Sequence, residues 1–407
     1  MTGTALQDGL QLSHWIEAVE SSPTMALSAR AMAMRRDGRD VLNLAAGEPD
    51  FDTPDHIREA AKRAIDEGKT RYTPAAGVPE LREAVAKRVA YRAGYEIKPE
   101  QVVITAGAKF ALYVSLAARV NPGNEVLVPA PYWVSYPSMV GMTGGRQTTV
   151  WAGPEQDYKV TVADLEAACT DRTRGLIFNS PSNPTGAVYS PEETCELAGW
   201  AAGRGLWIIS DEIYAEQRFG TDPYCSMLTA DPRGLDGTIL CDGFSKAYAM
   251  TGWRLGYLVG TADLARACTR MLGQTTSNAS SVSQYAALAA ATGPQDAVVQ
   301  MTASFRKRRD RIHAELAKIP GIACPMPEGA FYFFIDVRSY LGRKTPAGTP
   351  VGTSSELCEF LLEHEEIALV PGEGFGAPGF LRLSYAAAED VLTEAVTRFA
   401  RGLKQLA

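Results

Sequence analysis

Cysteine and histidine are scarce in this sequence, and neither forms a recognisable binding pattern. The 407 residues include seven cysteines without a C-x-x-C pair, and the four histidines lack the spacing of a metal-binding motif such as H-E-x-x-H. Because the cysteines are scattered and their total is odd, a disulfide framework is not expected. We therefore expect no metal site and a protein that works in the reducing cytoplasm.

The sequence also lacks long apolar runs and an excess of positive charge. No stretch is apolar enough to span a bilayer, and the first twenty residues contain Asp8, Glu17 and Glu20 in place of the apolar segment of a signal peptide. Lysine and arginine number 40 against 47 aspartates and glutamates, a net charge of −7. These properties predict neither a membrane nor a nucleic acid as partner.

What the sequence does contain is an alternation of strand and helix patterns. We predict strands at residues 101–105, 125–129, 174–179, 206–210, 238–242 and 256–259, with helices between them that include one at 132–142. Several strands are continuous apolar runs, as at Leu206-Trp207-Ile208-Ile209. Such runs are typical of strands covered on both faces. The predicted fold class is therefore α/β, a mostly parallel sheet covered by helices.

The pattern changes after about residue 300. A long basic helix, short strands and a final helix predict a smaller α+β domain there. We assign residues 1–24 to an N-terminal arm, residues 25–58 and 300–407 to the small domain, and residues 59–299 to the large domain. A chain of this length can form a deep pocket between two such domains.

Candidate catalytic residues follow the predicted strands, where ligand sites in parallel sheets lie. Lys246 comes four residues after the strand at 238–242. A lysine in a partly apolar site has a lowered pKa, and a neutral amine can form a Schiff base with an aldehyde. Taken alone, Lys246 is more simply interpreted as a solvated surface charge, so its neighbours decide.

Three further residues stand on a predicted strand or just after one. Asn183 lies in a loop with two X-Pro steps after residues 174–179, Asp211 follows 206–210, and Arg382 lies on a strand predicted at 380–384. A carboxylate can hold a pyridinium nitrogen protonated, and the planar fork of arginine suits a carboxylate. The alternative interpretations are that Asn183 is a turn residue, that Asp211 caps the N-terminus of a helix, and that Arg382 forms a surface ion pair.

Together these segments resemble the fold-type I pyridoxal-phosphate enzymes of the class I/II aminotransferase family. The resemblance covers essentially the whole chain and is strongest to the bacterial aspartate aminotransferases. The motifs that carry it are AGEPDFDTP at 46–54, YTPAAG at 72–77, PYWVSYP at 131–137, NSPSNPTG at 179–186, SDEIY at 210–214, GFSKAYAMTGWRLG at 243–256 and RLSY at 382–385. It implies a large domain that binds pyridoxal 5′-phosphate and a smaller α+β domain.

The resemblance implies roles for the residues around this cofactor. Lys246 carries it as a Schiff base and moves the proton between the substrate Cα and the cofactor, and Asp211 pairs with the pyridine nitrogen. Tyr214 and Asn183 hydrogen-bond the phenolic oxygen, and Trp133 stacks on the ring. The other implied cofactor contacts are Arg254, Ser245, Tyr72 and the backbone of Gly107, Ala108 and Lys109.

The resemblance also implies how the substrate is held. Arg382 takes the α-carboxylate near the backbone of Gly47. Lys109 takes a side-chain carboxylate, with help from hydroxyls near Ser22 and Thr24. The implied substrate-binding residues are therefore Gly47, Lys109, Trp133, Asn183, Arg382 and Thr24.

Two further implications concern the pocket edge and the assembly. The family pattern Gly-Gly-Lys-Gln reads Gly107-Ala108-Lys109-Phe110 here, so the edge of the pocket differs from that of the family. The alternative to a substrate-binding role is that Lys109 only lines the phosphate site or faces solvent. Tyr72 is expected to reach the phosphate of a neighbouring subunit, and Asn278 lies in a segment that reaches the same region. The resemblance therefore implies a homodimer with shared active sites.

The implied reaction transfers an amino group from an amino acid, with aspartate or glutamate favoured, to a 2-oxo acid in ping-pong half-reactions. The alternative is a pyridoxal-phosphate-dependent elimination, replacement or cyclisation in specialised amino-acid biosynthesis, because a fold does not fix a reaction. A non-enzymatic regulator is a third hypothesis. We do not favour it, because only about 24 residues precede the first shared helix, which leaves no appended DNA-binding module.

Overall fold

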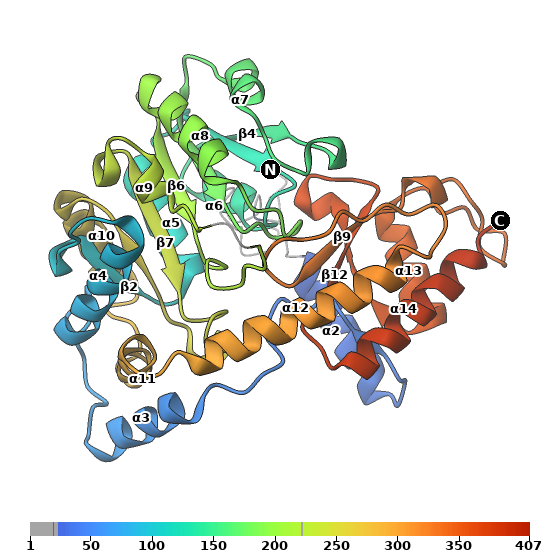
Figure 1. The fold of residues 1–407 in the computed structure, drawn as a ribbon, viewed down its shortest axis with the longest axis horizontal. Coiled ribbons are helices and arrows are strands. Elements are labelled where there is room, and N and C mark those ends of the chain that lie inside the picture. The colour runs from blue at the N-terminus through green and yellow to red at the C-terminus, as the bar shows by residue number, and fades with distance from the viewer. Residues whose placement is uncertain (1–18, 20–22, 221–222) are drawn as a thin grey trace, which may run out of the picture.

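A seven-stranded sheet forms the centre of the larger part of the molecule (Figure 1). The computed structural model describes residues 19, 23–220 and 223–407. The strands lie in the order β2 (Val102–Thr105), β8 (Gly256–Val259), β7 (Thr238–Gly243), β6 (Trp207–Asp211), β5 (Thr173–Asn179), β3 (Glu125–Ala130) and β4 (Arg146–Trp151). β8 runs antiparallel to both neighbours and the remaining pairs are parallel. The prediction of a mostly parallel sheet is confirmed.

Helices cover both faces of this sheet, as the continuous apolar strands require. One face packs against α4 (Pro79–Ala93), α8 (Pro191–Gly203) and α9 (Met227–Ala230), while α11 (Ser281–Thr292) packs on α4 and α3 (Asp55–Asp66) packs on α11. The other face packs against α5 (Ala108–Arg119), α6 (Tyr136–Met142) and α10 (Ala262–Thr275). A short α7 (Val162–Ala168) lies beside β4.

A second, smaller core is built around an antiparallel sheet in the order β11 (Val370–Pro371), β12 (Phe380–Ser384) and β9 (Tyr332–Asp336). β1 (Leu42–Asn43) pairs in parallel with β10 (Ile367–Ala368), so the N-terminal segment joins this part. The helices here are α2 (Pro23–Arg36), α13 (Ser354–Glu365) and α14 (Glu389–Lys404). Short 3-10 turns complete the structure at Pro99–Gln101, Pro154–Gln156, Gly234–Asp236, Thr251–Trp253, Arg338–Tyr340 and Gly372–Phe375.

One long helix, α12 (Asp296–Leu316), belongs to both cores (Figure 1). Its 21 residues span about 31 Å. Val298 packs with the large sheet, whereas Phe305, Ile312 and Leu316 pack in the smaller core. The two parts therefore share a rigid element.

The predicted domain division stays a prediction. Its boundaries at 58/59 and 299/300 fall inside α3 and α12. Most of the N-terminal arm lies outside the described residues. Within the part of the chain that the structure describes, no helix is long and apolar enough to cross a membrane.

The smaller core generates a test of packing. Leu361 of α13 is fully buried and lies against Gly402 of α14. Leu361→Ala should lower the free energy of unfolding by about 2–5 kcal/mol, because it leaves a cavity. Val299→Ala, at a side chain that is 67% exposed, should change it by less than about 0.5 kcal/mol. Urea denaturation of both variants measures this difference, and equal losses would contradict the packing described.

Candidate active site

Polar residues from distant parts of the chain meet at the carboxyl ends of the central parallel strands. Asn179 ends β5 and Asp211 ends β6, and the two residues are in register as neighbours. The segment after β7 carries Lys246. This is the edge at which open parallel sheets bind ligands. β12 and the segment after β1 bring Arg382 and Gly47 to the same place.

Lys246 is held in a partly apolar setting. Its amine donates a hydrogen bond to the carbonyl of Gly47, and it lies 5.9 Å from the ring centres of both Tyr214 and Phe331. Burial, together with the positive charge of Arg382, lowers the pKa of Lys246 to about 8. A fraction of the amine is therefore neutral near neutral pH, as a nucleophile or base requires.

Asp211 is a buried carboxylate with two protein donors. Its Oδ2 accepts a hydrogen bond of 2.7 Å from the hydroxyl of Tyr136, and its Oδ1 accepts from the backbone N–H of Ile213 at 3.3 Å. Burial raises the pKa of Asp211 to about 6, and the bond from Tyr136 opposes this effect. The group is thus ionised at neutral pH and can stabilise a buried cation beside it.

Arg382 is a buried guanidinium that has no acidic partner among the described residues. It donates to the side-chain oxygen of Asn183 at 3.0 Å and to the carbonyl of Ala45 at 2.7 Å. Its Nε has no hydrogen-bond partner in the described part of the chain. Burial lowers its pKa. Because an uncompensated buried charge is costly, this arrangement favours an anionic ligand such as a carboxylate.

A cradle for a second anion lies where α5 begins. Gly107 has φ 92° and no side chain caps this helix, so its first N–H groups can bind an anion. A Cβ at Gly107 would lie 2.7 Å from Nη2 of Arg254, and a Cβ at Gly256 would lie 2.3 Å from the backbone nitrogen of Ala108. Two glycines thus let a guanidinium and a neighbouring strand approach the helix, and the cradle fits the phosphate of the predicted cofactor.

Lys109 and Trp133 lie beside this cradle. The amine of Lys109 is 4.9 Å from the centre of the Trp133 ring, within the range of a cation–π contact. Burial and the charge of Arg254 lower the pKa of Lys109. Lys109 is therefore neither fully solvated nor paired with an acid of the described residues, which leaves it available to a negative group.

Tyr72, Asn278 and Ser245 make none of the contacts given above, and the described part of the chain does not include the side chains of Ser22 and Thr24. Tyr72 is 90% exposed. The amide of Asn278 donates to the carbonyl of the next residue at 2.7 Å. Ser245 is buried next to Lys246. Thr24 lies in α2 with its side chain outside the described part, and Ser22 lies outside the described residues altogether.

Three residues that sequence analysis did not single out complete the site. Asn179 donates to the carbonyl of Asp211 at 2.9 Å and accepts from the backbone of Asn183 at 2.9 Å, so it fixes the loop after β5. Tyr136 holds Asp211, and Tyr332 contacts the hydroxyl of Tyr214 at 2.7 Å. Asn179 and Tyr136 belong to motifs that were recognised, so only their partners were unknown.

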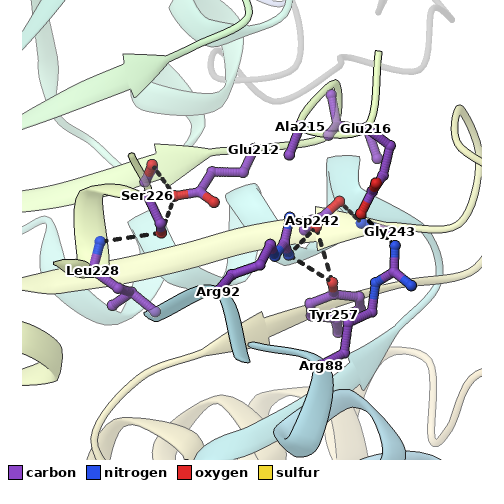
Figure 2. Close-up of polar contacts among 12 residues, drawn as sticks. Arg88, Arg92, Glu212, Ala215, Glu216, Ser226, Leu228, Asp242, Gly243 and Tyr257 are labelled. Carbon is purple, nitrogen blue, oxygen red and sulfur yellow. Dashed lines mark hydrogen bonds and ion pairs between the residues drawn. The ribbon is translucent and has the colours of Figure 1, made fainter. Parts of the chain in front are cut away.

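A buried charged network ties the end of β7 to α4, and Glu212 after β6 lies close enough to Arg92 of α4 to influence its charge (Figure 2). Asp242 of β7 accepts hydrogen bonds from Arg92 of α4 at 2.6 Å and from Tyr257 of β8 at 2.9 Å. Glu212 of the neighbouring segment accepts from Ser226 at 2.7 Å. Paired buried charges of this kind resist local opening, because removing one partner strands the other. The network therefore fixes the strand ends that carry the candidate catalytic groups. Among the described residues, no three acidic, histidine or cysteine side chains gather as a metal site requires.

Comparisons with known proteins match nearly the whole chain. The family model described as aminotransferase class I and II matches residues 39–399. The aspartate aminotransferase of Streptomyces avermitilis is 44% identical over 97% of each chain, and the aspartate/prephenate aminotransferase of Cereibacter sphaeroides is 44% identical over 95% of this chain and 97% of its own.

Solved structures extend the agreement to the fold. The aspartate aminotransferase from Rhizobium meliloti superposes with a TM-score of 0.93 at 38% identity, covering 98% of this chain and 100% of that chain. The Thermus thermophilus aspartate aminotransferase with maleate gives 0.90 at 39% identity, covering 96% and 99%.

The raised pKa of Asp211 predicts a pH-dependent effect in the ligand-free protein. The carboxyl titrates near 3.8 when unfolded and at about 6 when folded, so the stability that its protonated form contributes is lost as the pH rises through 6. Asp211→Asn cannot ionise. Its stability relative to the unmodified chain should therefore be greater at pH 7.5 than at pH 5, by about 1–2 kcal/mol.

Chemical denaturation at the two pH values measures this difference. Asp171→Asn is the matched control, because that side chain is exposed to solvent. An Asp211→Asn effect that is the same at pH 5 and pH 7.5 would show that the folded protein does not oppose ionisation of this carboxyl.

Proposed function

The chain belongs to the class I and II aminotransferase family, and on that premise we propose that it moves the amino group of aspartate or glutamate to a 2-oxo acid. It is a transaminase that depends on pyridoxal phosphate, so the resemblance in the sequence is confirmed. Its substrates are accordingly amino acids and 2-oxo acids. The observation that carries the proposal is the buried Arg382, which lacks an acidic partner among the described residues and lies near a lysine of lowered pKa.

The chain's own residues fit the cofactor in chemical type. Arg254 and the first N–H groups of α5 would hold the phosphate, and the carboxylate of Asp211 would hold the protonated pyridine nitrogen. Lys246 would bond to the aldehyde carbon. The other proposed cofactor contacts are Gly107, Ala108 and Lys109 through the backbone, Trp133 on the ring, Tyr214 and Asn183 at the phenolic oxygen, Ser245, and Tyr72 from a second chain.

Each remaining residue has a task in moving one proton. When bound, pyridoxal phosphate supplies an electron sink for the pair left at the substrate Cα after deprotonation. Arg382 binds the α-carboxylate and so places the Cα–H bond toward Lys246. The Nζ of Lys246 takes that proton and later returns it, which a pKa of about 8 allows near neutral pH. Asp211 keeps its negative charge fixed throughout, because Tyr136 and a backbone N–H hold both oxygens.

Preference for a dicarboxylic substrate rests on Lys109. Its amine lies 4.9 Å from the centre of the Trp133 ring and close enough to Arg254 for that charge to lower its pKa, and we assign it to the side-chain carboxylate of aspartate or glutamate. Thr24 is proposed to assist through its hydroxyl. The names of the relatives support this assignment, since each is an aspartate or an aspartate/prephenate aminotransferase.

We further propose that two chains form a homodimer with shared active sites. Tyr72 is 90% exposed, as a side chain that reaches into a second chain must be. Tyr72 and Asn278 would then reach the partner's phosphate site. The cytoplasm is the proposed location, because all seven cysteines are free.

Aspartate added alone to the cofactor-loaded enzyme should release oxaloacetate in amounts matching the active sites, because the enzyme keeps the amino group until an acceptor arrives. Lys246→Ala should slow this release by about 10²–10⁴-fold, since it removes the proton carrier. Rapid-mixing absorbance and oxaloacetate assays measure both effects. Release of ammonia in place of stoichiometric oxaloacetate would contradict amino-group transfer and would indicate elimination.

Lys109→Met should raise the KM for aspartate by about 10- to 100-fold, because a charge-assisted hydrogen bond to the side-chain carboxylate is lost. The KM for alanine, which has no such carboxylate, should change by less than about twofold if this single contact is all that is removed. Lys307→Met, at an exposed lysine on α12, is the matched control. Equal losses for both amino acids would assign Lys109 to the phosphate site.

A further inference from the structure

We propose that Tyr332 is a positioning residue that couples the substrate-binding guanidinium of Arg382 to the hydroxyl of Tyr214. The inference rests on the roles of Arg382 and Tyr214 in the proposed function. Tyr332 opens β9 and is fully buried. It lies on the strand paired with β12, two residues before Phe334, which is in register with Arg382. Side chains with this diagonal spacing share one face of a sheet.

The hydroxyl of Tyr332 controls the direction of one hydrogen bond. The Tyr214 and Tyr332 oxygens are 2.7 Å apart, and either can donate. Each phenol carries one hydrogen. If Tyr214 donates its hydrogen to the phenolic oxygen of the cofactor, it must accept the hydrogen of Tyr332. Burial raises the pKa of both tyrosines, so both hydroxyls stay protonated and this order of donors is kept.

Gly47 lets the hydroxyl of Tyr332 occupy this place. A Cβ at Gly47 would lie 3.0 Å from that oxygen. The same glycine presents its carbonyl to the amine of Lys246. The hydroxyl of Tyr332 therefore packs against Gly47, whose carbonyl also orients Lys246.

The ring of Tyr332 supports Arg382 from another direction. The guanidinium carbon lies 4.5 Å from the centre of the Tyr332 ring and 5.2 Å from that of Phe375. These contacts stabilise a buried cation that the described residues do not pair with a carboxylate. They also leave Nε of Arg382, which has no partner among the described residues, available to a substrate carboxylate. One side chain thus supports the substrate side with its ring and the cofactor side with its hydroxyl.

Two substitutions separate these functions. Tyr332→Phe keeps the ring and removes the hydroxyl. A hydrogen bond donated by Tyr214 stabilises the deprotonated, negatively charged form of the cofactor's phenolic oxygen. Without the hydroxyl of Tyr332, Tyr214 is no longer held as that donor. The pH midpoint of the absorbance change of the bound cofactor should therefore rise by about 0.5 to 1 pH units. The KM for aspartate and the Kd for succinate, measured by calorimetry on the loaded enzyme, should stay within about twofold. Tyr332→Leu also removes the ring, and it should raise both the KM for aspartate and the Kd for succinate by about five- to tenfold.

Tyr385→Phe is the matched control. Tyr385 is fully buried in the same core, and its hydroxyl donates to the carbonyl of Ala330 at 3.3 Å. This variant should leave the absorbance midpoint and the succinate Kd unchanged. If the unmodified enzyme releases oxaloacetate normally but Tyr332→Phe leaves the midpoint unmoved, the inference about Tyr332 is overturned. If the unmodified enzyme releases none, the proposed function fails instead. Because Tyr332→Phe is nearly isosteric, the test stands even if Tyr332→Leu does not fold.

Discussion

The buried guanidinium of Arg382 is the constraint on which the rest of the site depends. Its donors reach Ala45 in the N-terminal segment and Asn183 after β5, while its guanidinium carbon lies 4.5 Å from the centre of the Tyr332 ring of β9. Three distant parts of the chain are therefore fixed by one charge. Such a charge is costly to bury without a partner. A ligand carboxylate supplies that partner, so the arrangement that makes the ligand-free site expensive also makes binding of the substrate favourable.

Opposite shifts of two pKa values serve the chemistry. Burial acts on both groups, but it lowers the pKa of the Lys246 amine to about 8 and raises that of the Asp211 carboxyl to about 6. Near neutral pH the lysine is thus close to its midpoint, whereas Asp211 is ionised. The charged network of Arg92, Asp242 and Glu212 lies under the same strand ends. The site therefore combines a group that exchanges a proton with one that does not.

Sequence patterns predicted the large parallel sheet well. Lys246 and Asp211 could be proposed because they follow apolar strands, whereas Gly107 came only from the resemblance to the family. β4 was missed, since Arg146–Trp151 is an edge strand with an alternating, partly exposed pattern. The helix predicted from residue 132 begins at Tyr136, because the backbone of residue 132 is bonded to Phe375 in the distant small core. Partners such as Tyr136 and Tyr332 could not be predicted, because their roles come from contacts between residues far apart in sequence.

The continuity of α12 has a consequence for how the molecule unfolds. Val298 near its first turn and Leu316 at its last residue are buried in different cores. Unfolding of either core would expose apolar side chains of α12 and so weaken the packing of this helix in the other core. The two cores should accordingly behave as one cooperative foldon. Amides in the middle of α12 should then exchange with solvent only when the whole chain opens, and limited proteolysis should release no stable half.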